Sequence, residues 1–254
     1  MKKVRYYKTY NDDFEHTANQ DYKLPQNYKW VKRDFLSIIL SHLIYGIAVI
    51  FGGLYCRLFL HLKIKGKKSI KGLKGNCFIY CNHTQPVGDV FIPAICVLPK
   101  RIYTVVSSAN YGIPVIGKIL PYLGALPIAD SISGIKQLNN AIDYRLNDGH
   151  PIVIFPEAHV WEYYNDIRPF ANTSFKYPVK YNVATVVMTV TYRKSKFFKR
   201  PITEVYLDGP YYPEGDTLKE KINYLHDKVY VTMKKRAENS DFEYIKYINE
   251  YDNG

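Results

Sequence analysis

The chain begins with a polar segment and continues into a long apolar one. Residues 1–34 mix charged and aromatic side chains without a clear period, which predicts an extended or partly disordered polar arm. Phe35 to Cys56 contains no Lys, Arg, Asp or Glu. If these 22 residues form one helix, they extend over about 33 Å, which is enough for the hydrocarbon core of a bilayer. The pattern therefore indicates an N-terminal segment that contacts a membrane.

Basic residues stand on both sides of this apolar segment, with Lys32 and Arg33 before it and Arg57 directly after it. A single membrane span carries its basic excess mainly on the cytoplasmic side. Two basic flanks therefore favour a helical hairpin that dips into one leaflet and breaks near Gly46. A buried core helix is the alternative, but nothing in the segment is polar enough to face water. We predict a membrane-associated helical hairpin over residues 35–62 and leave full spanning open.

From Asn76 onward, short apolar runs alternate with amphipathic ones, which is typical of α/β domains. Strands are expected at residues 77–80, 101–106, 151–155, 183–191 and 202–207. Helices are expected to start near Val90, to cover residues 133–147 with Ser133 as the cap, and to follow the capping box Thr217–Glu220. We therefore predict that residues 63–254 form one α/β domain with a mixed sheet flanked by helices.

Charge and cysteine content narrow the classes of partner. Lys and Arg number 35 against 23 Asp and Glu, so the formal charge is +12 and an anionic partner is expected. Nucleic acid would explain the charge but not the uncharged N-terminal segment, so an anionic membrane surface is the better interpretation. The four cysteines form no C-x-x-C pair, which argues against zinc or redox chemistry and predicts buried thiols in a reducing compartment.

A polar loop carries the first candidate chemistry. Asn82, His83 and Asp89 follow the apolar run that ends at Tyr80, and open α/β sheets place their chemistry at such strand ends. An imidazole can take a proton near neutral pH, and a neighbouring carboxylate can fix its tautomer. The alternative is a loop histidine that only caps the next helix.

Three loops together resemble the motifs of the glycerolipid acyltransferase family, which includes the lysophosphatidate acyltransferases. The family pattern is N-H-x-x-x-x-D, then G-x-I-P-I-D-R, then F-P-E-G-T-R-S, then an apolar run with a proline. The corresponding segments here are Asn82-His83 with Asp89, Gly124 to Ser131, Phe155 to Trp161 and Thr185 to Val190, with Phe175-Lys176 at the place of a family Phe-Lys pair. The resemblance covers residues 76–191.

The resemblance implies transfer of a fatty acyl group from acyl-CoA or acyl-carrier protein to a hydroxyl of a lysophospholipid-like acceptor. His83 would be the general base and Asp89 would orient it, with backbone N–H groups after His83 holding the oxyanion. No cofactor beyond the acyl donor is implied. Substrate binding is expected at Glu157, Asp130, Lys176 and Arg168. Glu157 has an equal alternative as a structural carboxylate paired with Arg168, and a solvated Lys176 is the default.

Several positions depart from the family pattern. The interval between His83 and Asp89 is one residue longer than in the family, although a loop can absorb one residue. Ser131 and Val160 stand where the family has arginines associated with the acceptor's phosphate, and Ala158 stands where it has glycine. Arginine is the natural bidentate clamp for phosphate. The resemblance therefore supports acyl transfer better than it supports lysophosphatidate as the acceptor.

Two other classes of function remain open from the sequence. A metal-dependent hydrolase could use His83, Asp89, Glu157 and His159 as ligands, but no H-E-x-x-H motif or dense histidine cluster is present. A non-catalytic membrane lipid-binding relative is the second alternative. For the acyltransferase we expect a membrane-associated protein with its catalytic domain on the cytoplasmic face.

Overall fold

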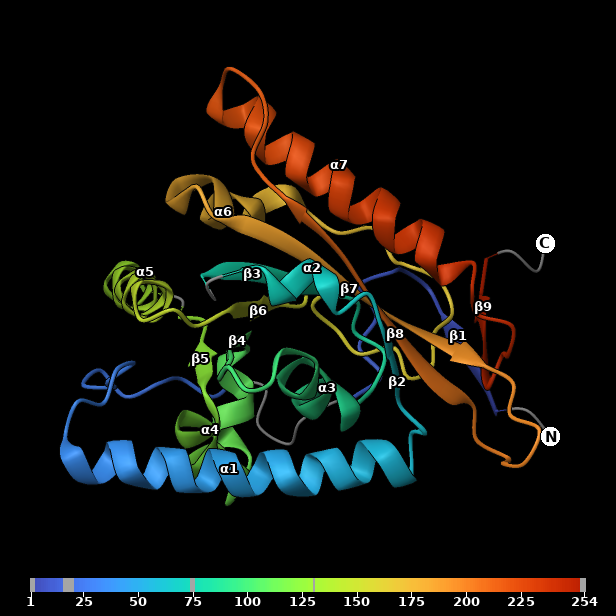
Figure 1. Ribbon diagram of the computed structural model, residues 1–254, viewed down its shortest axis with the longest axis horizontal. Coiled ribbons are helices and arrows are strands. Elements are labelled where there is room, and N and C mark those ends of the chain that lie inside the picture. The colour runs from blue at the N-terminus through green and yellow to red at the C-terminus, as the bar shows by residue number, and fades with distance from the viewer. Residues whose placement is uncertain (1–2, 16–20, 74–75, 130, 252–254) are drawn as a thin grey trace.

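The computed structural model describes residues 3–15, 21–73, 76–129 and 131–251 (Figure 1). Its main feature is a seven-stranded sheet in the order β2-β8-β7-β3-β6-β4-β5. The strands in this order are β2 (Lys63–Lys65), β8 (Ile202–Tyr211), β7 (Ala184–Arg193), β3 (Cys77–Cys81), β6 (Ile152–Ile154), β4 (Tyr103–Val106) and β5 (Ala125–Pro127). Neighbouring strands are parallel except for β7 and β8, which pair antiparallel. The sheet is therefore mixed, as the sequence predicted.

Helices cover both faces of the sheet (Figure 1). They are α1 (Phe35–Leu58), α2 (Lys68–Lys71), α3 (Gly88–Val97), α4 (Ile116–Leu123), α5 (Ile132–Asn147), α6 (Lys176–Tyr181) and α7 (Leu218–Ala237), with short 3-10 helices η1 (Ser108–Gly112) and η2 (Asn172–Phe175). In Figure 1, α1, α3 and α4 lie below the sheet, whereas α6 and α7 lie above it. The molecule thus has three layers, with a hydrophobic core on each face of the sheet.

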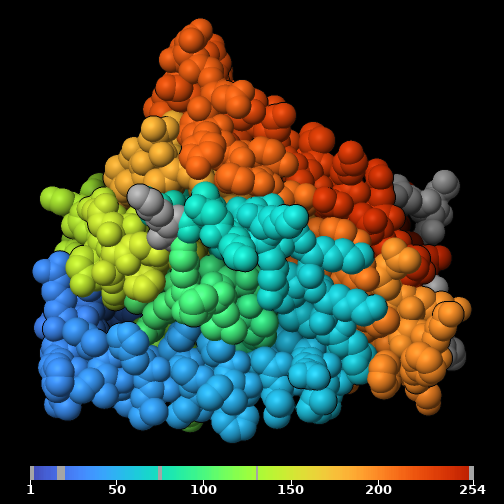
Figure 2. Space-filling model, viewed as in Figure 1, coloured from blue at the N-terminus to red at the C-terminus, as the bar shows by residue number. Residues whose placement is uncertain are grey.

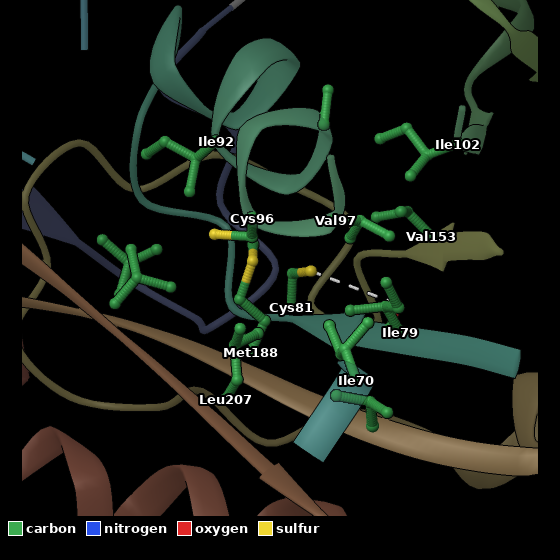
Figure 3. Close-up of a cluster of buried hydrophobic side chains, with 14 of the residues drawn as sticks. Ile70, Ile79, Cys81, Ile92, Cys96, Val97, Ile102, Val153, Met188 and Leu207 are labelled. Carbon is green, nitrogen blue, oxygen red and sulfur yellow. Dashed lines mark hydrogen bonds between the residues drawn. The ribbon is translucent and has the colours of Figure 1, made fainter. Parts of the chain in front are cut away.

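The central strand β3 shows why the sheet needs cover on both faces. All five of its residues are buried, which is typical of a strand in the middle of a largely parallel sheet. Side chains alternate along a strand, so Cys77, Ile79 and Cys81 join the core between the sheet and α3, while Phe78 and Tyr80 join the core between the sheet and α5 and α7. Figure 3 shows Ile79 and Cys81 in the first of these cores. Cysteine here acts as a small buried hydrophobe, and all four cysteines are free and buried, as predicted.

The helix caps follow the sequence with one correction. Thr217 and Glu220 form the predicted capping box at the start of α7. Helix α5 begins one residue earlier than predicted, and its cap is Ser131, whose hydroxyl accepts a hydrogen bond from Gly134 N at 3.0 Å. Ser133 lies inside the helix. Both serines fit a capping signal, and only the structure decides which one keeps the extended backbone that a cap requires.

The predicted N-terminal hairpin is wrong, because α1 is one continuous helix of 24 residues. A lone glycine costs a helix only about 1 kcal/mol, so Gly46 does not have to break it. One side of α1 docks on the folded domain, where Arg101 donates to Ser41 Oγ at 2.7 Å and Gly52 packs so closely on Phe91 that a Cβ would lie 2.3 Å from the ring. The other side is apolar and exposed. By length and composition α1 could cross a membrane.

The N-terminal arm packs on the folded domain, and this corrects the expectation of a partly disordered lead over its described residues. Strand β1 (Lys3–Tyr7) pairs in parallel with the C-terminal strand β9 (Ile245–Asn249). The aromatic side chains of the arm explain this order, since Tyr7 and Phe14 pack on the fully buried Trp161 at ring distances of 4.8 and 5.3 Å. The arm and the C-terminal tail therefore close over the loop that follows β6.

Candidate active site

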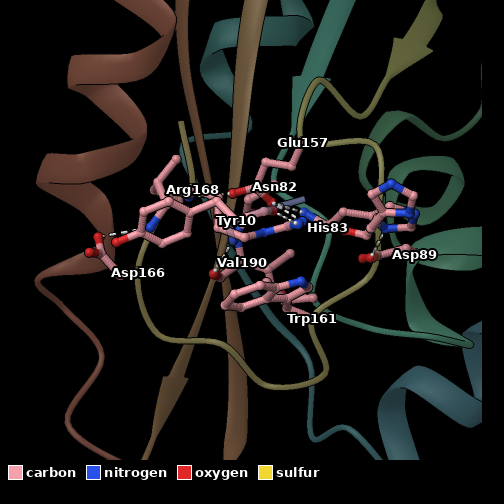
Figure 4. Close-up of polar contacts among 12 residues, drawn as sticks. Tyr10, Asn82, His83, Asp89, Glu157, Trp161, Asp166, Arg168 and Val190 are labelled. Atoms are coloured by element: carbon pink, nitrogen blue, oxygen red, sulfur yellow. Dashed lines mark hydrogen bonds and ion pairs between the residues drawn. The ribbon is translucent and has the colours of Figure 1, made fainter. Parts of the chain in front are cut away.

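Asn82 fixes the end of strand β3 immediately before the candidate base. Its side-chain amide donates to Val190 O at 3.0 Å and accepts from Val190 N at 2.8 Å (Figure 4). A carboxamide carries both a donor and an acceptor, so it can replace a backbone pair and extend the β3–β7 ladder by one step. Aspartate or alanine could not make both bonds. Asn82 therefore sets the direction in which the chain leaves the sheet at His83.

His83 and Asp89 meet across the loop despite its additional residue. His83 Nδ1 lies 2.7 Å from Asp89 Oδ2, and the same carboxylate oxygen accepts a hydrogen bond from Gln85 N at 2.9 Å (Figure 4). The turn at Pro86 and Val87 absorbs the extra residue before Asp89 enters the first turn of α3. A carboxylate is favoured at a helix N-terminus. The contact expected from the sequence is therefore present.

This contact determines the state of the second imidazole nitrogen. Because an ionised carboxylate only accepts hydrogen bonds, His83 Nδ1 donates to Asp89, and Nε2 of the neutral ring keeps its lone pair. Within the described ranges, Nε2 has no hydrogen-bond partner, and the side chain is 20% exposed against 3% for Asp89. Phe155 stacks on a face of this ring, with the two ring centroids 4.3 Å apart. His83 thus presents a free basic nitrogen in a fixed orientation.

Glu157 faces inward and supports His83 from behind. One carboxylate oxygen accepts from His83 N at 2.8 Å, and the other accepts from Arg168 N at 2.8 Å. The Arg168 guanidinium lies 3.5 Å from the same carboxylate, and both side chains are buried. Burial raises the pKa of the Glu157 carboxyl, and Arg168 opposes this shift. This geometry corresponds to the alternative in which Glu157 is a structural carboxylate paired with Arg168. Both of its oxygens are engaged by backbone N–H groups of the protein.

The other predicted substrate-binding residues differ in their surroundings. Arg168 is occupied by Glu157 and by the backbone oxygens of Tyr10 and His159. Lys176 is exposed at the start of α6, with its ammonium 5.3 Å from the centre of the Tyr177 ring. Asp130 lies outside the described residues. The structure therefore brings together His83, Asp89, Glu157 and Arg168, with only the first two arranged for chemistry.

Sequence reasoning missed the residues that hold the loop. The phenol of Tyr192 contacts Thr84 Oγ1 at 2.7 Å and accepts from Gln85 Nε2 at 3.0 Å, which anchors the loop to β7. Trp161 N donates to His83 O at 3.0 Å, so the loops after β3 and β6 pair through their backbones. A tyrosine directly after the β-branched run 183–191 was the available signal. His83 N and Gln85 N are both engaged here, which removes them as candidate oxyanion donors.

A cavity of about 160 Å³ opens beside the His83–Asp89 loop. Its wall includes Gln85 to Val87 of that loop, Tyr55 of α1, Tyr163 and Arg200. The charged residues in this lining are Arg200 and Glu162. The Glu162 carboxylate pairs at 3.0 Å with Arg5, which does not line the cavity. The cavity thus lies between the candidate base and the end of the apolar helix.

Three family positions can now be compared with their surroundings. Ser131 is occupied as the cap of α5, and Val160 brings no charge to the loop after β6. Ala158 has a φ of +65°, in the left-handed region that favours glycine. This chain therefore keeps the left-handed backbone at the position of the family glycine, although the residue here is alanine.

The sheet with its His–Asp loop can now be compared with known proteins. The model of the family described as Acyltransferase matches residues 61–193, just over half of the chain, and the chain therefore belongs to the acyltransferase family. Among solved structures, the 1-acyl-sn-glycerophosphate (LPA) acyltransferase PlsC from Thermotoga maritima matches with a TM-score of 0.57 and 17% identity, over 84% of this chain and 87% of that one. At this identity the match shows a shared fold. No curated protein matches the sequence.

Proposed function

We propose that the protein transfers a fatty acyl group from acyl-CoA or acyl-carrier protein to a hydroxyl of a lysophospholipid-like acceptor. The observation that carries the proposal is the 2.7 Å contact between His83 Nδ1 and Asp89, which leaves Nε2 unpaired within the described part of the site. Nε2 takes the proton of the acceptor hydroxyl as its oxygen attacks the thioester carbonyl. The tetrahedral intermediate then expels the thiolate, which receives the proton, so no covalent enzyme intermediate is needed.

Asp89 and Glu157 have different parts in this scheme. Asp89 holds the imidazole in the tautomer with a free Nε2 and stabilises the imidazolium that forms when the ring takes a proton. Glu157 holds the backbone of His83 through its 2.8 Å hydrogen bond and does not touch the ring. Asp89 therefore acts on the proton, whereas Glu157 acts on the position of the residue that accepts it.

The acceptor that fits this site best carries less charge than a phosphomonoester. PlsC from Thermotoga maritima is, by its name, an acyltransferase of 1-acyl-sn-glycerophosphate. Here Ser131 and Val160 replace the two family arginines, and the Arg168 guanidinium is paired with the Glu157 carboxylate. Arg200 is the basic residue in the cavity lining beside the loop. A single exposed guanidinium suits a lysolipid with a phosphodiester or a neutral head group.

The proposal includes a position at an anionic membrane surface, with the domain on the cytoplasmic face. The outward side of α1 exposes large apolar residues, among them Phe35, Leu36, Leu43, Ile50, Phe51 and Leu54. The loop between β7 and β8 lies near the C-terminal end of α1 (Figures 1 and 2). In this loop Phe198 stacks on His61, just after α1, with ring centroids 3.7 Å apart. Phe197 in the same loop is 88% exposed and has Lys196 and Lys199 beside it.

The other two classes of function fit the structure less well. In the described segments, no group of three or more His, Cys, Asp or Glu residues is arranged to hold a metal ion. His159 instead pairs with Asp13 at 3.3 Å, and Glu157 pairs with Arg168. A non-catalytic lipid-binding relative would have no need for a free imidazole nitrogen backed by a buried carboxylate. Acyl transfer is therefore the function that the geometry supports best.

The test is direct. Purified protein is incubated with acyl-CoA or acyl-carrier protein and, in turn, with lysophosphatidate, lysophosphatidylcholine, lysophosphatidylglycerol and a neutral monoacylglycerol. We expect an acylated form of the acceptor and one free thiol for each product molecule. Binding of lysolipid without release of any thiol would instead support the non-catalytic alternative.

A further inference from the structure

A second cavity, of about 190 Å³, lies far from His83 and is unusually rich in cations. Its lining combines the end of the N-terminal arm, the first half of α1 and the ends of α4 and α5. Ser41 of α1 lines this cavity, whereas Tyr55 of the same helix lines the cavity beside the His83 loop. At the helical rise of about 1.5 Å per residue, the two positions are roughly 21 Å apart. The second cavity is thus separate from the candidate active site.

Arg101 lines this cavity and has no charged partner among the described residues. It is 9% exposed, and its Nη2 donates to Ser41 Oγ and to Tyr122 O, each at 2.7 Å. Both acceptors are neutral, and Nε is buried without a hydrogen-bond partner. Among the described residues, no carboxylate lies within ion-pair distance of this guanidinium. A buried charge without an opposite charge is costly, so a bound anion would stabilise Arg101.

Two neighbouring cations of this cavity, Arg145 and Lys32, likewise contact aromatic rings. The Arg145 guanidinium lies 4.3 Å from the Tyr103 ring centre, and its Nε is also buried without a partner. The Lys32 ammonium lies 4.0 Å from the Tyr122 ring centre, and Lys29 is a further lining residue. Aromatic faces, not carboxylates, thus hold two more of these cations.

Asp148 is the acidic residue in the lining, against the four cations Lys29, Lys32, Arg101 and Arg145. Its carboxylate lies 3.2 Å from His150 Nε2, which takes up part of its capacity to accept hydrogen bonds. Arg101 also caps the end of α4 through Tyr122 O, and this structural role explains its Nη2 but not its unpaired Nε. The cavity therefore keeps a large positive excess after its internal contacts are counted.

We propose that this cavity binds a phosphate group. Arginine offers a planar fork of donors that matches phosphate oxygens, and two arginines and two lysines converge here from separate elements. Two sources carry this chemistry: the head group of an anionic lipid, since α1 also carries the exposed apolar surface, or a soluble phosphate ester. A bound phosphate would join the arm, α1 and α5 to one another.

The experiment uses the full chain and inorganic phosphate as the probe. Binding is measured by calorimetry and by tryptophan fluorescence, because Trp30 lines the cavity. The second tryptophan, Trp161, does not line it and packs against Phe14 of the N-terminal arm. We expect saturable binding of one phosphate. The double variant Lys29→Gln/Lys32→Gln should weaken it tenfold or more, because a charged hydrogen bond is worth more than the free energy of a tenfold change.

The matched control is Lys219→Gln/Lys235→Gln on α7, which removes the same charge from exposed positions on the other side of the sheet (Figure 1). It should bind phosphate as the wild type does. Arg145→Gln provides a further variant inside the cavity and should weaken binding to a similar degree. Absence of saturable binding, or equal binding by the cavity variants and the control, would overturn the proposal.

Two further binding measurements distinguish a lipid head group from a soluble phosphate ester. Phosphatidylcholine vesicles with and without phosphatidate test the lipid head group, and coenzyme A tests a soluble phosphate ester. If the source is a lipid, phosphatidate vesicles compete with inorganic phosphate, and the lysine variant loses their extra binding. If the source is soluble, coenzyme A competes and the vesicles do not. Acyl-transfer activity is recorded separately, so failure of this proposal is distinct from failure of the proposed function.

Discussion

The backbone N–H of His83 donates a 2.8 Å hydrogen bond to the carboxylate of Glu157, which joins the loop after β6 to the loop after β3. The second Glu157 oxygen binds Arg168 N, so one buried carboxylate organises two chain segments. In this arrangement the Phe-Pro-Glu motif supports the loop that carries the candidate base. The candidate base is thus held through its backbone by a buried carboxylate.

Replacing Glu157 with glutamine should therefore lower both the free energy of unfolding and the turnover number. The amide has one acceptor oxygen where two N–H donors need acceptors, and it leaves the Arg168 charge without its partner. Breaking a buried ion pair costs about 3–5 kcal/mol. Denaturant unfolding of Glu157→Gln should show a loss of this order, together with a reduced turnover number. The exposed Glu238→Gln is the control, and a change in KM alone would instead indicate contact with the acceptor.

Ala158→Gly should stabilise the protein. Ala158 has a φ of +65°, and the left-handed region costs a residue with a Cβ about 1–2 kcal/mol. Glycine removes this cost but gains entropy in the unfolded chain, so the net gain should be about 0.5–1 kcal/mol. Ala171→Gly, at a φ of −75°, is the matched control and should not stabilise. Equal loss of unfolding free energy in both variants would show that no strain is stored at Ala158.

The outward side of α1 should anchor the protein to lipid. Leu43, Ile50 and Leu54 are between 55% and 69% exposed. Burying a side chain of this size stabilises by about 1.5–3 kcal/mol, so changing all three to glutamine should lower vesicle binding by more than a hundredfold. Leu218→Gln/Val231→Gln on the exposed side of α7 should have no effect. Unchanged sedimentation of the triple variant with vesicles would place the anchor elsewhere.

Lysophosphatidate should not be strongly preferred as acceptor. Each charged hydrogen bond is worth about 1.5–3 kcal/mol, and the two family arginines that would make such bonds are Ser131 and Val160 here. Competition between equimolar lysolipids in one reaction measures the preference. Val160→Arg should shift the products toward phosphatidate, with Val160→Met as an uncharged control. A strong wild-type preference for lysophosphatidate would imply a phosphate clamp that replaces the arginines.

The sequence predicted the elements of the fold well because their signals are local. Each signal lies within a few residues: the apolar run of β3, the β-branched run of β7 and the capping box of α7. The course of α1 was not visible, because its docking depends on contacts such as that of Arg101 with Ser41, 60 residues apart. The order of the arm likewise depends on β9, at the opposite end of the chain.

The same distinction applies to the site. His83 and Asp89 lie six residues apart, so a loop could be expected to join them. The roles of Tyr192 and Asn82 rest on partners 108 residues away, which no local pattern reveals. For Glu157, the sequence allowed two interpretations of equal weight, and only its burial and its backbone donors distinguish them.

The acyl-transfer rate of His83→Ala, measured beside Asp89→Asn and the wild type, tests the proposed mechanism most directly. Loss of a general base costs about 10²–10⁴-fold, so His83→Ala should lose turnover to this extent while its unfolding transition and vesicle binding remain. Asp89→Asn should lose less, because it keeps the imidazole and removes only its charged partner. Near-normal turnover by His83→Ala would contradict the proposed mechanism.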